Sequence, residues 1–150
     1  MSKSLYTAQA TVKGGRAHGH GVTSDGALDV QLRTPTEMGG EGGGTNPEQL
    51  FAVGYAACFE GALGVVGRRE HAELGDVSID SRVSLVTTEG RGFNVAAELR
   101  VTLPGISDPA QAAQIVGAAH EVCPYSNATR GNIDVTLTAN GQEVSVPAAA

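Results

Sequence analysis

The chain has 150 residues, of which 41% are hydrophobic and 17% charged, the size and composition of one globular domain with its own core. Sixteen acidic against ten basic residues give a formal net charge of -6, so the chain lacks the basic surplus of nucleic-acid-binding proteins. No uninterrupted apolar stretch reaches the roughly 18 residues of a membrane span, and the N-terminus lacks a signal-peptide pattern. We therefore expect a cytoplasmic protein with no nucleic acid and no membrane as a partner.

The first third of the sequence predicts short antiparallel strands. Residues 6–12 alternate weakly, residues 18–23 follow a glycine pair, and residues 28–32 follow a Ser-Asp-Gly turn. These patterns predict a three-stranded meander. The glycine-rich residues 36–44 are too flexible to hold regular structure on their own and are predicted to form a mobile loop.

A long apolar helix is predicted to begin after Asn46. Asn46 is a favoured N-cap, Pro47 fits the first helical position, and Gln49 is placed to close a capping box. Nearly every residue from 50 to 66 is apolar or small, so we expect this helix, which ends near Arg68, to be covered on all sides. Each interior glycine disfavours the helix by about 1 kcal/mol relative to alanine, and we expect other backbones to pack closely there.

The second half of the sequence predicts a long hairpin, a second helix and a final hairpin. The expected elements are strands at 77–87 and 93–103, a helix from Pro109 to about Val122, an irregular turn at 125–132, and strands at 133–138 and 143–146 around Asn140-Gly141. Together they indicate an α+β fold of antiparallel strands around a buried central helix. We expect one domain over residues 1–150, with a frayed tail at 148–150.

Two cysteines, Cys58 and Cys123, are the candidate redox residues. Cys58 lies in the middle of the predicted central helix, where a free cysteine often only fills space. Cys123 ends the second helix, where a thiol can be partly exposed. From the composition alone, a redox pair and two unrelated structural thiols are open alternatives.

A reactive Cys58 needs a cation, because it lies too deep in the helix for the helix dipole to lower its pKa. Lowering that pKa from about 8.5 to about 6 requires about 3.4 kcal/mol of favourable interaction, which one close arginine can supply. Taken alone, Arg16 resembles a surface charge and Glu48 a helix-start carboxylate. Glu48 precedes Cys58 by ten residues, about 15 Å along one straight helix, so both serve one site only if a second subunit contributes.

A metal or nucleotide site receives little support from the sequence. His18 and His20 would share one strand face and His120 precedes Cys123 by three residues, which makes a zinc site conceivable. No Cys-x-x-Cys pair completes such a site, and the glycine-rich loop lacks the Gly-Lys-[Ser/Thr] element of a phosphate cradle. We expect no metal and no cofactor.

Two segments resemble the signature regions of a known family. Residues 44–59 (GTNPEQLFAVGYAACF) and 122–135 (VCPYSNATRGNIDV) are similar to those of the organic hydroperoxide resistance (Ohr) proteins of the OsmC/Ohr family. The Gly-Gly-Arg that ends at Arg16 and the turn at 24–26 match in order, so the resemblance covers essentially the whole chain. It implies an OsmC/Ohr-like fold in an intertwined homodimer with sites at the subunit interface.

The resemblance also implies a thiol peroxidase that reduces organic, often fatty-acid-derived, hydroperoxides to alcohols. Cys58 is then the peroxidatic cysteine, Cys123 the resolving cysteine, Arg16 the cation near the thiolate, and Glu48 the carboxylate that holds this arginine. A Cys58 sulfenic acid would give a Cys58–Cys123 disulfide, which a dithiol, by resemblance a lipoylated protein, would reopen.

The expected substrate preference follows from the apolar surroundings. Phe51, Tyr55, Phe59 and the 36–44 loop are predicted to bury the hydrocarbon part of an alkyl hydroperoxide. The alternatives are a peroxide-responsive redox sensor or binding module without turnover, and a dimeric protein with inert buried thiols. The family resemblance assigns no role to His18 or His20.

Overall fold

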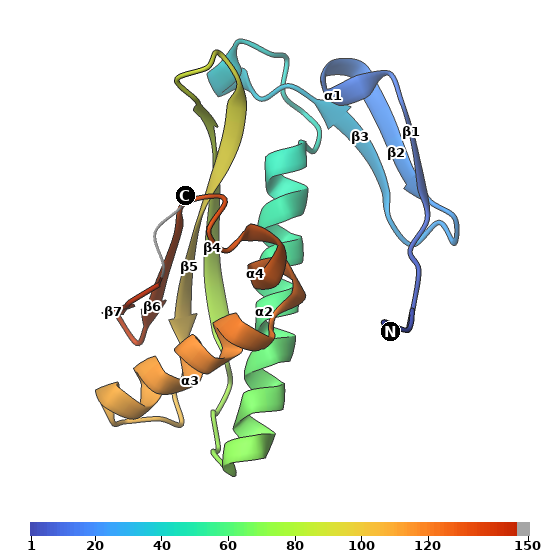
Figure 1. The fold of residues 1–150 in the computed structure, drawn as a ribbon. Coiled ribbons are helices and arrows are strands. Elements are labelled where there is room, and N and C mark those ends of the chain that lie inside the picture. The colour runs from blue at the N-terminus through green and yellow to red at the C-terminus, as the bar shows by residue number, and fades with distance from the viewer. Residues whose placement is uncertain (147–150) are drawn as a thin grey trace. The chain divides into compact units, whose positions relative to one another are not determined.

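The computed structural model describes residues 1–146 of the chain (Figure 1). The chain divides into two compact units, Met1–Leu50 and Phe51–Ala150. Helices occur together with two sheets whose neighbouring strands are antiparallel except at one pair, so the predicted α+β class is confirmed. The tail predicted to fray at 148–150 lies outside the described residues.

The first unit is built on a three-stranded antiparallel sheet. Its strands are β1 (Ala10–Lys13), β2 (Gly19–Thr23) and β3 (Asp29–Arg33), in that order. This confirms the predicted meander, although the first strand begins only at Ala10. A one-turn helix, α1 (Gly15–His18), connects β1 to β2. Gly14 before it has a φ of 82°, and a Cβ there would lie 2.8 Å from the His18 carbonyl oxygen, so the turn requires glycine.

The glycine-rich segment after β3 folds into hydrogen-bonded turns. It contains a short 3-10 helix, η1 (Thr36–Met38), which ends at Gly39 with a φ of 81°. The backbone N–H groups of Gly40 and Gly42 donate to the carbonyl oxygens of Pro35 and Thr34, each at 3.0 Å. The loop is therefore tied back to the end of β3, and its mobility stays a prediction.

The long helix α2 (Pro47–Glu70) begins as predicted. The side-chain oxygen of Asn46 accepts the backbone N–H of Gln49 at 2.9 Å, which confirms the N-cap. Only one face of the helix is buried, however. Its buried residues recur every three or four positions, whereas Val53 is 70% exposed. Within one chain the helix is not buried on all sides as predicted, and a helix made of apolar and small residues carries no polar stripe to mark its open face.

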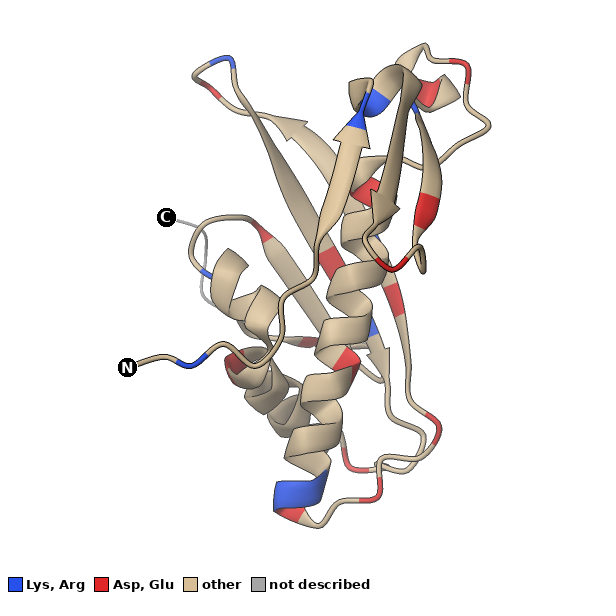
Figure 2. Ribbon diagram, turned by 90° about the vertical axis from the view of Figure 1, so that its right-hand side faces the viewer, with Lys and Arg blue, Asp and Glu red and all other residues tan. Residues whose placement is uncertain are grey.

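Helix α2 is almost free of charged residues along most of its length (Figure 2). By length and composition alone it could cross a membrane, contrary to the expectation from uninterrupted apolar runs. The core helix of a soluble protein passes the same test, and α2 contributes Tyr55, Phe59 and Leu63 to the core of the second unit.

The second unit contains a four-stranded sheet in the order β4-β5-β6-β7. The elements after α2 are β4 (Ser78–Thr87), β5 (Phe93–Thr102), α3 (Pro109–Val122), α4 (Pro124–Thr129), β6 (Val135–Ala139) and β7 (Gln142–Val144). All neighbouring strands are antiparallel except β5 and β6, which pair in parallel because α3 and α4 carry the chain back between them. The prediction of an irregular turn over 125–132 is wrong where α4 forms, with Pro124 at its first position.

The core of the second unit lies between one face of this sheet and the helices. Alternate residues of β5, Ala97, Leu99 and Val101, are buried together with side chains of α2 and α3. The turn between β6 and β7 is the predicted Asn140-Gly141 pair, with φ values of 48° and 82°.

Candidate functional site

The sulfur atoms of Cys58 and Cys123 lie 3.6 Å apart. Both thiols are free, since a disulfide requires an S–S length of about 2.05 Å. Cys123 is fully buried and Cys58 is partly exposed. The structure thus brings together two residues whose meeting the sequence left open.

Backbone hydrogen bonds on both sides hold Cys123 at the corner between α3 and α4. Its N–H donates to the carbonyl oxygen of Ala119, and its carbonyl oxygen accepts the N–H of Asn127, both at 2.9 Å. Pro124 ends α3 because it has no N–H with which to continue the helix. Cys123 is therefore both the C-cap of one helix and the N-cap of the next.

Burial raises the pKa of the Cys58 thiol above its ordinary value. The backbone N–H of Tyr125 acts in the opposite direction, whereas the hydrogen bond with Cys123 and the charge on Cys123 raise the pKa further. Within the described part of the second unit, no cation opposes these effects. The lowered pKa that a reactive cysteine needs is therefore not supplied by the unit that carries Cys58.

The first unit holds the predicted pair of Arg16 and Glu48. Arg16 lies on α1 and Glu48 in the first turn of α2, and their side chains form an ion pair of 2.6 Å. The Glu48 side chain is only 15% exposed and that of Arg16 is 38% exposed. The Nε of Arg16 is buried and has no hydrogen-bond partner among the described residues. The structure joins these two predicted residues to each other, and it joins the two cysteines to each other.

The three histidines considered for zinc occupy separate places. His18 ends α1 and His20 lies on β2, so the prediction of one shared strand face is wrong because a one-turn helix precedes β2. His20 pairs with Asp29 at 2.6 Å on the surface, whereas His120 is buried and contacts Ser126. Within residues 1–146, no three His, Cys, Asp or Glu side chains converge as metal ligands would.

An aromatic cluster lies beside Cys58. The rings of Phe51, Tyr55 and Tyr125 have centroids 5.9 to 6.0 Å apart. A Cβ at Gly54 would lie 3.1 Å from the Tyr125 hydroxyl oxygen, so Gly54 allows this close approach. Tyr55 and Phe59 are fully buried core residues, so they do not line an open apolar surface as predicted.

The prediction that interior glycines of α2 mark close packing holds only in part. At Gly54 the neighbour is a side chain rather than another backbone. A Cβ at Gly61 would meet nothing within 4 Å, and a Cβ at Gly64 would meet only the Arg68 guanidinium, at 3.5 Å. These two positions lie where α2 is not closely packed.

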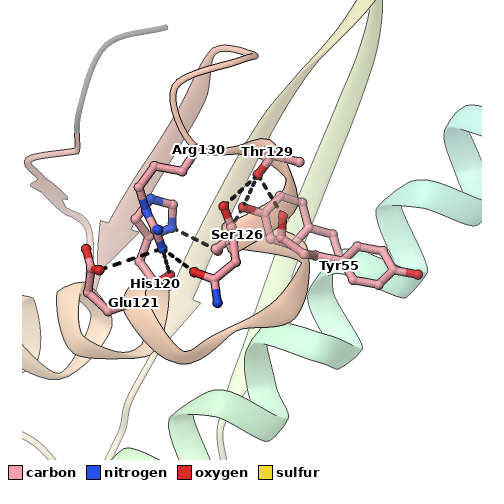
Figure 3. A network of polar contacts seen from close by, with 8 residues as sticks. Tyr55, His120, Glu121, Ser126, Thr129 and Arg130 are labelled. Atoms are coloured by element: carbon pink, nitrogen blue, oxygen red, sulfur yellow. Dashed lines mark hydrogen bonds and ion pairs between the residues drawn. The ribbon is translucent and has the colours of Figure 1, made fainter. Parts of the chain in front are cut away.

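A buried polar network that joins α2, α3 and α4 was not predicted from the sequence (Figure 3). Ser126 bonds both His120, at 2.8 Å, and Tyr55, at 2.9 Å, and Tyr55 also contacts Thr129 at 3.1 Å. Burial lowers the pKa of His120, and the nearby Arg130 guanidinium lowers it further. The one sequence signal is spacing, because His120 and Ser126 each stand three residues from Cys123.

A comparison with known families identifies the class to which this arrangement belongs. A family model described as OsmC-like protein matches residues 40–138, a segment that includes both cysteines and all the residues of the buried network. The chain therefore belongs to the OsmC family, in its organic hydroperoxide resistance branch.

Individual relatives are similar over almost their whole length. The chain is 59% identical over 138 residues to the organic hydroperoxide resistance protein of Xanthomonas axonopodis pv. citri, covering 91% of this chain and 95% of that protein. A crystal structure of such a protein from Legionella pneumophila is 52% identical with a TM-score of 0.85, covering 90% of this chain and 97% of that one. The crystal structure of OhrB of Bacillus subtilis is 47% identical with a TM-score of 0.81, covering 89% of this chain and 98% of that one. The predicted OsmC/Ohr-like fold is therefore confirmed.

Proposed function

We propose that this chain is a cysteine-based thiol peroxidase that reduces alkyl and fatty-acid hydroperoxides to alcohols. The observation that carries the proposal is the 3.6 Å separation of the two free thiols, because it lets one cysteine react with the oxidised form of the other. The names of its relatives support a role in organic hydroperoxide resistance. The two signature segments found in the sequence contain these same cysteines.

In the first step, the Cys58 thiolate attacks the terminal peroxide oxygen in line with the O–O bond. This bond breaks, the alkoxide takes a proton and leaves as the alcohol, and Cys58 becomes a sulfenic acid. We assign to Arg16 the stabilisation of the negative charge that develops on the departing oxygen. Glu48, which bonds Arg16 at 2.6 Å, orients the guanidinium.

Arg16 is also proposed to ionise the thiol. Burial raises the pKa of Cys58, so the positive charge must come from outside the unit that carries it. Because Glu48 precedes Cys58 by ten residues on α2, we assign the Arg16–Glu48 pair at each pair of cysteines to the other subunit of an intertwined homodimer. In that assembly the guanidinium would lower the pKa of Cys58 by favouring the thiolate.

Exposed apolar residues of the first unit support the homodimer. Val12 is 57% exposed and Leu28 44% exposed. Both line a cavity of about 110 Å³ on the small sheet, together with Val30 and Leu50. Burying such a surface against a second copy would provide apolar contact that the three strands lack by themselves.

In the second step, the Cys123 thiol condenses with the sulfenic acid, which forms the disulfide and releases water. A dithiol, which we propose to be a lipoylated protein, reopens this bond by exchange. The sulfur pair carries both electrons, so the proposed cycle uses no cofactor. Reduced thiols of this kind fit the cytoplasm, where we place the protein as a single OsmC/Ohr-like domain over residues 1–150.

The test is turnover of tert-butyl hydroperoxide with dihydrolipoamide as the reductant, with Cys58→Ser as the control. Repeated turnover by the wild type alone is expected. A single oxidation of Cys58 without recycling would favour a peroxide-responsive sensor or binding module. No oxidation of Cys58 at all would mean inert thiols and would contradict the proposal.

A further inference from the structure

A buried chain of hydrogen bonds connects the three helices that surround the cysteine pair (Figure 3). It runs from His120 on α3 through Ser126 on α4 to Tyr55 on α2, and from there to Thr129 on α4. None of these four residues is more than 7% exposed. Burying polar groups costs folding free energy unless each group has a hydrogen-bond partner, so this hydrogen-bond chain constrains how the three helices pack together.

The protons on these groups give the hydrogen-bond chain a direction. The Thr129 hydroxyl bonds the carbonyl oxygen of Tyr125 at 2.9 Å, and a carbonyl can only accept, so the single proton of Thr129 lies in that bond. Tyr55 must then donate to Thr129, Ser126 to Tyr55, and Nδ1–H of His120 to Ser126. His120 is therefore the Nδ1–H tautomer, and every hydroxyl in the chain both donates and accepts once.

The residues of the hydrogen-bond chain lie in the same short segments as the two cysteines. Tyr55 precedes Cys58 by three residues on α2, and His120 and Ser126 stand three residues before and after Cys123. Tyr55 and Cys58 therefore lie on neighbouring positions of one face of α2, whereas Cys123 is the corner between the helices that carry His120 and Ser126. The final acceptor belongs to Tyr125, whose backbone N–H donates toward the Cys58 sulfur.

We propose that this hydrogen-bond chain is a positioning device that fixes the α3–α4 corner against α2 and thereby keeps the Cys123 sulfur within reach of Cys58. The inference rests on the proposed function only for its effect on the peroxide cycle. The positioning of the two reduced thiols holds for any oxidant.

The expected effect concerns a competition at the Cys58 sulfenic acid. Attack by Cys123 forms the disulfide and releases water. Attack on a second hydroperoxide instead transfers one oxygen to sulfur, which gives a sulfinic acid and one alcohol. If the α3–α4 corner holds the Cys123 sulfur close to Cys58 for a smaller fraction of the time, more of the sulfenic acid becomes sulfinic acid.

Three variants test the chain with small changes in shape. Thr129→Val removes the hydroxyl at almost constant volume, and Thr129→Ser retains it as the rescue. Tyr55→Phe removes only the phenolic oxygen. Tyr6→Phe makes the same chemical change at a tyrosine that is 81% exposed and serves as the matched control.

The first measurement uses diamide and needs no peroxide. Diamide takes two electrons and two protons from a pair of thiols, leaving the disulfide and its own hydrazine form. We expect Thr129→Val and Tyr55→Phe to form the Cys58–Cys123 disulfide at least about fivefold more slowly than the wild type. Thr129→Ser and Tyr6→Phe should form it at close to the wild-type rate. Equal rates in all folded variants, checked by circular dichroism, would overturn the positioning role.

The second measurement uses tert-butyl hydroperoxide with mass spectrometry of the Cys58 products. The ratio of sulfinic acid to disulfide should rise about fivefold in Thr129→Val and return toward the wild type in Thr129→Ser. An unchanged ratio would contradict the role in the cycle. If the wild type leaves the hydroperoxide intact, the proposed function fails, and the diamide rates still decide the positioning role.

The third measurement concerns the proton on His120. Long-range nitrogen-15 NMR of histidine-labelled protein should show the Nδ1–H tautomer for the signal that disappears in His120→Asn. A proton on Nε2 would reverse the deduced direction of the chain and contradict the proposal.

Discussion

The thiol of Cys123 donates to the sulfur of Cys58 across 3.6 Å, although 65 positions separate the two residues in the sequence. The donor is the fully buried sulfur and the acceptor is the partly exposed one. Burial and the neighbouring Cys123 both raise the pKa of Cys58, so its ionisation depends on a cation from outside the pair. Its partial exposure nevertheless suits Cys58 as the sulfur that an oxidant reaches first.

Replacing each cysteine separately should give different products. We expect Cys58→Ser to abolish peroxide reduction, because the attacking sulfur is gone. Cys123→Ser should complete one turnover and then accumulate sulfinic acid at Cys58, because no second thiol captures the sulfenic acid. Mass spectrometry after one and several equivalents of peroxide distinguishes them, and equal residual cycling in both variants would contradict the division of roles.

Removing the Arg16 guanidinium should slow oxidation of Cys58 by about a hundredfold. Titration of Cys58 with iodoacetamide should show a pKa below the ordinary value of about 8.5 in the wild type and a higher one in Arg16→Ala. Arg69→Ala removes a surface charge from the exposed end of α2 and is the control. A Cys58 pKa that is equally high in all three proteins would return Arg16 to the role of a surface charge.

The stability of the protein should fall at mildly acidic pH because of His120. Burial and Arg130 hold the pKa of His120 below its ordinary value of about 6.5, so below that pH the unfolded chain binds a proton that the folded chain does not. The stabilisation is complete above about pH 6.5 and declines as the pH falls toward the lowered pKa. His120→Asn retains an N–H donor without titrating there, so urea unfolding at about pH 7.5 and 5.5 should show a smaller difference for this variant. The same pH dependence in both proteins would assign the effect to other groups.

Asn140 should contribute to stability through its side chain as well as through the turn. Its amide accepts the N–H of Leu103 at 2.7 Å and donates to the carbonyl oxygens of Leu103 and Ile106 at 3.2 and 3.0 Å. Asn140→Gly tolerates the φ of 48° but loses these bonds, and should lower the free energy of unfolding by about 1–3 kcal/mol. Asn140→Ala should lose more, because alanine adopts this backbone conformation less readily than glycine. Thermal or urea unfolding measures both, and a neutral Asn140→Gly would show that the side-chain bonds add little.

Local signals in the sequence predicted most of the element boundaries. Asn46 before Pro47 and Asp108 before Pro109 each begin a helix, and both side chains accept a backbone N–H as N-caps do. The parallel pairing of β5 with β6 was not predictable, because it depends on where the intervening helices return the chain. For the same reason the open face of α2 could not be predicted from a segment with apolar and small residues all round.

For the candidate site as well, the sequence predicted which residues are involved but not which of them are in contact. Family signatures pointed to Cys58, Cys123, Arg16 and Glu48 as functional residues, but the contact of the two cysteines and the ion pair of Arg16 with Glu48 each depend on tertiary structure. The buried hydrogen-bond network could not be predicted, since Tyr55 looks like an ordinary apolar helix residue in the sequence. Its hydroxyl has a role only because α4 places the hydroxyls of Ser126 and Thr129 beside it.

Cys123 has no exposed surface, whereas Cys58 does. In the proposed cycle, an incoming dithiol can therefore reach the disulfide only at the Cys58 sulfur, so the mixed disulfide forms there and Cys123 departs as the leaving thiolate. The regiochemistry of reduction is thus set by the fold and is the same for a protein-bound lipoyl arm and for a small soluble dithiol.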